Sequence, residues 1–159
     1  MEGNMTNEEV INKFYSSFSA ADAEGMNSCY HKDVVFEDPA FGQLKGDRVR
    51  GMWSMLLKRS GGGLDVKFSD VKADEHTGSA KWIAKYNYGP KKRPVVNNVS
   101  ASFEFKDGKI IKHTDHFDSW KWASMALGLP GKLLGWTPFL KNKVKGETNK
   151  LLDQFMAKK

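Results

Sequence analysis

The segment 108–122, GKIIKHTDHFDSWKW, constrains the fold more than any other part of the chain. Ile111, His113, Asp115 and Phe117 occupy alternate positions, so an extended strand would place all of them on one face. That face combines apolar residues with an imidazole and a carboxylate, which are costly in a packed core unless they are hydrogen-bonded. We therefore expect this strand to line a cavity, with a solid core as the alternative.

Strand periodicity also occurs in three preceding runs, at 64–73, 77–88 and 95–105, and the last two alternate most strongly. Asp107 and Gly108, between the third run and the final strand, form a strong signal for a tight hairpin. Strands joined by short turns pair in antiparallel fashion. The sequence from residue 64 to residue 117 therefore predicts an antiparallel meander.

Helical signals dominate the N-terminal part of the chain. Thr6 and Glu9 have the spacing of a capping box, and an apolar stripe follows at Ile11, Phe14, Tyr15 and Phe18. Asp22 is expected to cap a short second helix carrying Met26, Cys29 and Tyr30. A strand at 34–38 and a loop at 42–46 precede a third helix, which Asp47 is expected to cap. Helices followed by a meander predict an α+β fold with the helices on one face of a curved sheet.

Composition bounds the class of protein. The 159 residues suit one domain, and a hydrophobic share of 40% is enough for a sizeable core. We interpret the net charge of +6 as a solvated basic face near the C-terminus, without a stacking platform for nucleic acid. A single cysteine, the lack of a long apolar run and an acidic N-terminus unlike a secretory signal favour a soluble cytoplasmic protein.

The motifs VFEDPAFG at 35–42, DGKI at 107–110 and TDHFD at 114–118 resemble the nuclear transport factor 2-like superfamily, in its SnoaL-like and ketosteroid-isomerase-like branch. The resemblance implies a cone-shaped, curved mixed or antiparallel sheet wrapped around the N-terminal helices, a cystatin-like α+β barrel that encloses an apolar pocket. It implies a cone-fold ligand-binding domain at 1–120. The helical extension at 121–159 is expected to pack on that domain or on a dimer partner. A homodimer through the convex sheet face is also implied.

The resemblance to the isomerases implies a general base at Asp38. Their phenol, however, falls on Phe14, with Tyr15 beside it, and their second acid falls on Ala101. An oxyanion hole of that kind is therefore not expected here, which argues against steroid isomerisation.

Two other groups of relatives point to the last strand. In limonene-type epoxide hydrolases the terminal aspartate matches Asp115, but the arginine and first aspartate fall on Trp82 and Ala84. The resemblance to SnoaL-type cyclases implies an acid–base aspartate near this strand, often with a histidine. Asp115 together with His113 is the nearest match to that arrangement.

Asp115, His113 and Asp38 are accordingly the candidate catalytic residues, because a carboxylate in an apolar cavity suits acid–base chemistry. Alternative roles are a structural Asp115 bonded to the backbone or to Trp82, a satisfied pocket histidine, and a turn cap at Pro39. The candidate ligand-binding residues, whose aromatic members could instead be plain core, are Phe14, Tyr15, Phe18, Phe36, Trp53, Trp82, Tyr86 and Asn97. The spacing matches no metal motif, so we expect neither metal nor cofactor.

The tail begins with an apolar group at 120–129, continues through a loop-like stretch at 129–139 and ends in an amphipathic basic helix at 139–156. It is interpreted as a lid over the pocket or part of a dimer interface, in preference to a contact with an anionic membrane. For the whole chain we expect a small-molecule-binding protein, as an acid–base isomerase, cyclase or hydratase acting on an apolar ligand. The alternative is a non-catalytic carrier or interaction module.

Overall fold

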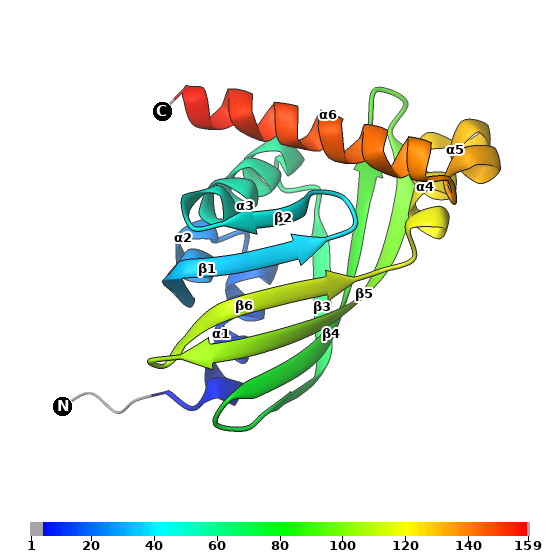
Figure 1. Ribbon diagram of the computed structural model, residues 1–159. Helices are drawn as coiled ribbons and strands as arrows, with labels where there is room; N and C mark the ends of the chain where they lie inside the picture. Colours follow the sequence, from blue (N-terminus) through cyan, green and yellow to red (C-terminus); the bar gives the residue numbers. More distant parts are fainter. Residues whose placement is uncertain (1–4, 159) are drawn as a thin grey trace.

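The computed structural model describes residues 5–158; the first part of the acidic N-terminus, 1–4, and Lys159 lie outside it. A curved six-stranded sheet in the order β2-β1-β6-β5-β4-β3 carries helices on its concave side (Figure 1). The elements are α1 (Asn7–Ser19), α2 (Ala23–Asn27), β1 (Tyr30–Asp38), β2 (Gly42–Lys45), α3 (Asp47–Ser60), β3 (Asp65–Ala73), β4 (Thr77–Tyr88), β5 (Arg93–Lys106), β6 (Lys109–His116), α4 (Ser119–Leu127), α5 (Leu129–Leu134) and α6 (Pro138–Ala157). The predicted α+β cone is confirmed.

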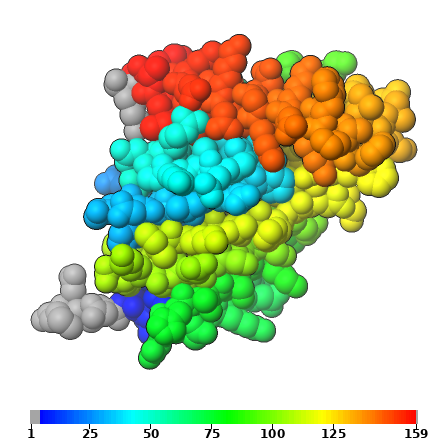
Figure 2. Space-filling view, viewed as in Figure 1, coloured from blue at the N-terminus to red at the C-terminus, as the bar shows by residue number. Residues whose placement is uncertain are grey.

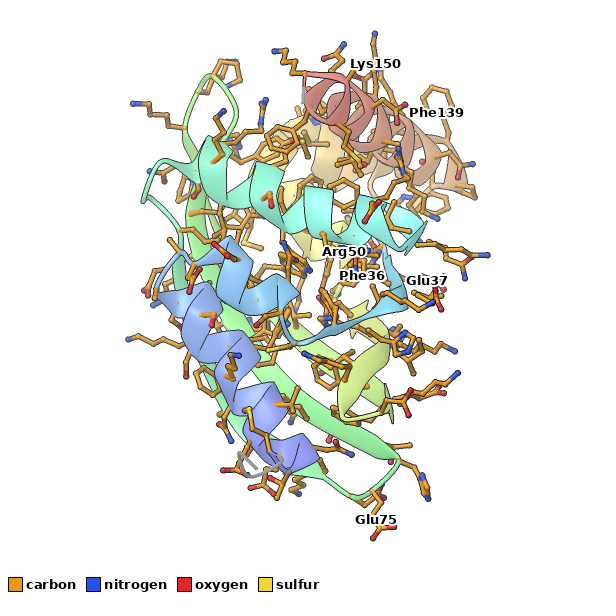
Figure 3. The ribbon with its side chains drawn as sticks, turned by 90° about the vertical axis from the view of Figure 1, so that its left-hand side faces the viewer. Phe36, Glu37, Arg50, Glu75, Phe139 and Lys150 are labelled. Atoms are coloured by element: carbon orange, nitrogen blue, oxygen red, sulfur yellow. The ribbon has the colours of Figure 1, made fainter. Side chains whose placement is uncertain are left out.

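The meander β3–β6 is antiparallel throughout, as predicted, and β6 then pairs with β1 in parallel. Burial alternates along β5, where Val95, Asn97, Val99, Ala101 and Phe103 face inward. The same alternation on β1 turns Phe36 into the interior and Glu37 outward (Figure 3). These inward faces pack on α1, whose capping box at Thr6 and Glu9 is present and whose predicted stripe is fully buried.

Several local predictions were wrong. The segment at 42–46 forms the short strand β2 rather than a loop, and Tyr30 begins β1 instead of belonging to the second helix. Asp47 is the first residue of α3, whose N-cap is Gly46. On β6, the register shifts opposite Glu104, so that Ile110 is fully buried and the predicted Ile111 is only half-buried.

The stretch expected to be a loop after Leu129 contains the helix α5. Its glycines serve close packing rather than chain reversal, because a Cβ on Gly131 would lie 1.9 Å from the Ala123 carbonyl oxygen. A Cβ on Gly135 would lie 2.8 Å from the Ala123 Cβ. Glycine therefore lets α5 lie directly against α4.

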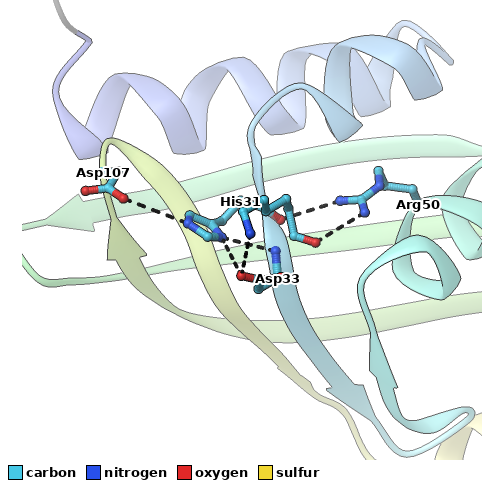
Figure 4. Close-up of polar contacts among 5 residues, drawn as sticks. His31, Asp33, Arg50 and Asp107 are labelled. Carbon is cyan, nitrogen blue, oxygen red and sulfur yellow. Dashed lines mark hydrogen bonds and ion pairs between the residues drawn. The ribbon is translucent and has the colours of Figure 1, made fainter.

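Arg50 links α3 to the first residues of β1 (Figure 4). Its guanidinium donates to the carbonyl oxygens of His31 at 3.5 Å and Lys32 at 3.3 Å, and it pairs with Asp47 at 2.7 Å. The His31 ring in turn lies 3.9 Å from Asp107 at the β5–β6 hairpin. These contacts fix the position of α3 relative to the start of β1, where the candidate site begins.

The tail covers one end of the sheet, where β1, β4 and β6 finish and β5 starts (Figure 1). α4 packs Trp122, Ala123 and Ala126 around Val95 of β5. α6 crosses the turn after β1, and Thr148 Oγ1 and Asn149 Nδ2 donate to the carbonyls of the two residues before Gly42, at 2.7 and 2.8 Å. The tail is thereby bonded to the turn after β1, at the end of the sheet that we call the mouth of the cone.

Candidate functional site

A chain of polar side chains runs through the interior from α3 to β4. The Trp53 indole N–H donates to the Tyr30 hydroxyl at 2.8 Å, and that hydroxyl lies 2.8 Å from His113 Nδ1. His113 Nε2 lies 2.8 Å from Asp115 Oδ1, and the Trp82 indole N–H approaches the same oxygen at 3.5 Å. His113 and Asp115 therefore do meet on the inward face of β6, and the structure adds Tyr30 to them.

An indole N–H can only donate, so the Tyr30 oxygen accepts from Trp53. One assignment of protons pairs every group of the chain: the Tyr30 hydroxyl donates to His113 Nδ1, and the imidazole N–H on Nε2 donates to Asp115 Oδ1. Asp115 Oδ2 makes no hydrogen bond within residues 5–158.

Aromatic rings enclose the imidazole. The ring centroids of Phe103, Phe36 and Phe14 lie 4.5, 5.0 and 5.4 Å from that of His113. His113 is 0% and Asp115 is 2% exposed. Polar groups buried this deeply are tolerated because each is hydrogen-bonded, and the chain of bonds holds Asp115 in one orientation.

Asp38 lies at the mouth of the cone and is half-buried. Its Oδ1 accepts from the backbone N–H groups of Ala40 at 3.0 Å and Phe41 at 2.7 Å, so it does cap the turn after β1. Burial, with a smaller contribution from the charge of Asp115, raises the pKa of Asp38 to about 7, against the opposing effect of those N–H groups and Lys145. Asp38 can therefore exchange a proton near neutral pH.

Two further polar groups of the predicted set have unused hydrogen-bonding capacity. The Tyr15 hydroxyl is fully buried and has no hydrogen-bond partner in the described part of the chain. Burial and then the nearby Asp115 charge raise its pKa. The Asn97 side chain, 9% exposed on the inward face of β5, makes no hydrogen bond among residues 5–158 either. The Tyr15 hydroxyl in particular calls for a partner, because a fully buried polar group without one is costly.

The remaining predicted ligand-binding residues are aromatic side chains that surround the polar chain. Phe18 packs against Trp53 and Trp82 with centroid separations of 5.0 and 5.1 Å. Tyr86 is half-buried nearer the mouth, where its hydroxyl accepts from the Trp122 indole of α4 at 2.8 Å. The tail therefore touches a predicted site residue directly.

Neither of two surface hollows reaches His113 or Asp115. One lies between α4, α6 and the turn after β1, lined by Pro39, Ala40, Phe117, Trp122 and Val144 among others. The other lies on the outer face of the sheet, beside Ser102, Thr114 and His116. Neither hollow is thus the cavity expected beside His113 and Asp115, because the rings of Phe14, Phe36 and Phe103 pack around the imidazole.

Sequence reasoning missed Tyr30, which joins the two halves of the polar chain. Its bond to His113 spans 83 positions and depends on the parallel pairing of β1 with β6. No local pattern around Tyr30 signals that contact. As for metals, no cluster of at least three His, Cys, Asp or Glu side chains in residues 5–158 is arranged to hold an ion.

Solved structures with a similar fold include TerC co-crystallised with polyporic acid, with 19% identity over 75% of this chain and 96% of that one and a TM-score of 0.65. A proposed polyketide cyclase from Xanthomonas campestris pv. campestris shows 16% identity over 75% and 95% of the two chains, with a TM-score of 0.60. An LEH-like epoxide hydrolase of M. tuberculosis shows 22% identity over 80% and 95%, with a TM-score of 0.59. A comparison with curated proteins finds no match.

At these identities the likeness establishes the fold, a nuclear transport factor 2-like α+β cone. The profile of the SnoaL-like domain matches residues 11–113, which include most of α1 and most of the sheet. Of the polar chain, Tyr30, Trp53, Trp82 and His113 lie inside the match and Asp115 lies outside it. The chain belongs to the SnoaL-like domain family.

Proposed function

We propose that this chain binds an apolar small molecule inside the cone and transfers a proton on it with Asp115. The observation that carries the proposal is a set of inward polar groups with unused hydrogen-bonding capacity: Tyr15 Oη, the Asn97 amide and Asp115 Oδ2. They come from three different elements and stand among aromatic walls, as in sites that orient a largely apolar ligand. The similarity to a proposed polyketide cyclase and an epoxide hydrolase supports a ligand of this class.

The chemistry proposed is that of an isomerase, cyclase or hydratase. His113 holds Asp115 through Oδ1, which leaves Oδ2 to take a proton from the ligand and to return it at another ligand atom. Asp38, whose pKa is raised to about 7, is the second acid–base group of the proposal. The Trp82 indole and the Tyr30–Trp53 pair position the carboxylate and do not themselves react.

A non-catalytic carrier is the second candidate, and one observation favours it. The positions at which related enzymes hold a phenol, a second acid or an arginine carry Phe14, Ala101 and Trp82, all of them buried in the core. A chain with these residues retains the pocket shape of the family without a complete catalytic set.

A thermal-shift screen of apolar ketones, epoxides and lactones identifies ligands, because a compound that binds only the folded state raises the melting temperature. Asp115→Asn is then compared with Asp65→Asn, a change at an exposed carboxylate on β3. We expect Asp115→Asn to keep the ligand-induced shift and to lower turnover by about 100-fold or more, while Asp65→Asn changes neither. Undiminished turnover in Asp115→Asn would exclude Asp115 as the residue that transfers the proton. If no compound of these classes stabilises the protein, ligand binding itself is refuted.

We also propose a homodimer formed through the outer face of the sheet, where Ile83 and Val96 are 38% and 44% exposed. In this proposal residues 121–159 act as an extension of the cone domain 1–120, and the buried thiol of Cys29 is kept reduced in the cytoplasm. Light scattering at about 100 µM tests the dimer, because an interface of standard size holds two copies together at that concentration. A monomer mass would exclude it.

A further inference from the structure

Six large apolar side chains are exposed between residues 120 and 139, on α4, on α5, in the connection from α5 to α6 and at the start of α6. We call them the tail patch: Trp120 at 50%, Leu129 at 66%, Leu133 at 61%, Leu134 at 46%, Trp136 at 61% and Phe139 at 72% exposure. Figure 2 shows these elements as one continuous surface at an end of the molecule, and Phe139 lies on its outside in Figure 3. Clustered exposure of this kind marks an interaction surface.

The tail patch is held in shape by its own hydrogen bonds. The Trp120 indole N–H donates to the Lys132 carbonyl at 2.9 Å, and the Trp136 indole N–H donates to the Leu133 carbonyl at 3.1 Å. The only polar atom of each indole is thus bonded within the tail. Both rings can enter an apolar environment without leaving a donor unpaired.

Positive charge surrounds the tail patch. Residues 119–146 contain no Asp or Glu, and their lysines are Lys121, Lys132, Lys141, Lys143 and Lys145. All of these are exposed except the half-buried Lys145. The β4–β5 hairpin adds Arg93, which donates to the Met125 carbonyl at 2.8 Å, and the exposed Lys91 and Lys92.

We propose that the tail patch docks on an anionic phospholipid surface. Tryptophan, phenylalanine and leucine side chains enter the boundary between headgroups and acyl chains, while lysines around them attract anionic lipids. A second copy of this chain fits less well, because a two-fold contact would bring lysine-rich rims together without a carboxylate from 119–146 on either side. The chain lies on the surface in this arrangement, and none of the helices in residues 5–158 has the length and hydropathy to cross a bilayer.

Co-sedimentation of the full chain with phosphatidylcholine vesicles, with and without about 30% phosphatidylglycerol, tests the proposal. We expect binding to the anionic vesicles only, falling about tenfold when salt rises from about 0.05 to 0.5 M. Phe139→Ser is expected to weaken binding about tenfold, whereas Leu151→Ser, a control on the same helix with 37% exposure, leaves it unchanged.

Charge is tested separately. Lys132→Glu with Lys143→Glu is expected to abolish vesicle binding, while Lys67→Glu with Lys106→Glu, which changes net charge equally at exposed sites outside the tail, retains it. Circular dichroism confirms that each variant is folded. Absence of binding by the wild type, or equal loss in both charge variants, overturns the proposal. So does a concentration-dependent dimer that Phe139→Ser dissociates, since a second copy would then cover the tail patch.

Discussion

Replacing a buried tyrosine by phenylalanine should lower the stability of the protein at Tyr30 and should leave it equal or raise it at Tyr15. Tyr30 and Tyr15 are 5% and 0% exposed, and each substitution removes a single hydroxyl. The Tyr30 hydroxyl bridges the Trp53 indole and His113 Nδ1, at 2.8 Å from each, whereas the Tyr15 hydroxyl has no partner within residues 5–158. Comparing the two substitutions therefore separates the effect of lost hydrogen bonds on stability from the effect of lost side-chain volume.

The expected magnitudes follow from these contacts. Tyr30→Phe leaves two buried polar atoms without partners, at about 1–3 kcal/mol each, so we expect a loss of about 2–6 kcal/mol in the free energy of unfolding. For a chain of this size, at about 3 °C per kcal/mol, that corresponds to a fall of about 6–18 °C in melting temperature. Tyr15→Phe removes a hydroxyl that folding strips of water without replacing its hydrogen bonds, so stability should stay equal or rise by up to about 2 kcal/mol.

Urea denaturation of the ligand-free protein, followed by tryptophan fluorescence and circular dichroism, measures both values, and unchanged m-values show that the unfolded states are comparable. A Tyr30→Phe variant as stable as the wild type would refute the hydrogen bonds of the Tyr30 hydroxyl to Trp53 and His113. A Tyr15→Phe variant destabilised by more than about 1 kcal/mol would show that its hydroxyl is bonded, contrary to the argument for a ligand partner there.

Two further predictions concern the mouth of the cone. Because the pKa of Asp38 in the folded state, about 7, lies above its ordinary value of 3.8, the folded protein holds a proton that the unfolded chain releases, and stability should fall as pH rises between these values. Asp38→Asn keeps the Oδ1 acceptor, and its free energy of unfolding should exceed that of the wild type by on the order of 2 kcal/mol at about pH 8 but not at about pH 4. Urea titrations that show no such difference would contradict the raised pKa of Asp38. Asn149→Ala removes two bonds that hold α6, the one donated to the Phe41 carbonyl and the one accepted from Arg48, and should speed amide hydrogen exchange in 138–157 by about tenfold. Asn12→Ala, whose amide bonds only within α1, is the control, and equal exchange in both variants would show that α6 is held by other contacts.

The parts of the fold that repeat with the helix or strand period could be predicted from sequence. The stripe on α1 and the alternation on β5 reflect burial at regular intervals, and the hydrophobic pattern records that burial directly. His113 and Asp115 were predicted together for the same reason, since positions two apart on a strand share a face. What each of them contacts was left open, because partners come from other elements.

Features set by tertiary contact escaped sequence reasoning. Tyr30 precedes the obvious strand pattern, and its role depends on a parallel pairing that no turn signals. Gly131 and Gly135 normally indicate a loop, yet here they permit close helix packing, which shows only when Ala123 of α4 is placed beside them. The irregular register near Ile110 likewise depends on the pairing with β5 and not on local composition.

The ligand proposal and the membrane proposal meet at α4. One side of this helix buries Trp122 and Ala123 against the end of the sheet and lines the hollow at the mouth of the cone. Trp120, two residues before Trp122, belongs to the tail patch. The bond from Trp122 to Tyr86 is the direct link between α4 and the predicted site, at 2.8 Å. A surface that binds Trp120 therefore contacts the helix that packs against this end of the sheet. An apolar ligand concentrates in the bilayer. Docking at the tail patch would therefore place the mouth of the cone beside the membrane in which the ligand is dissolved.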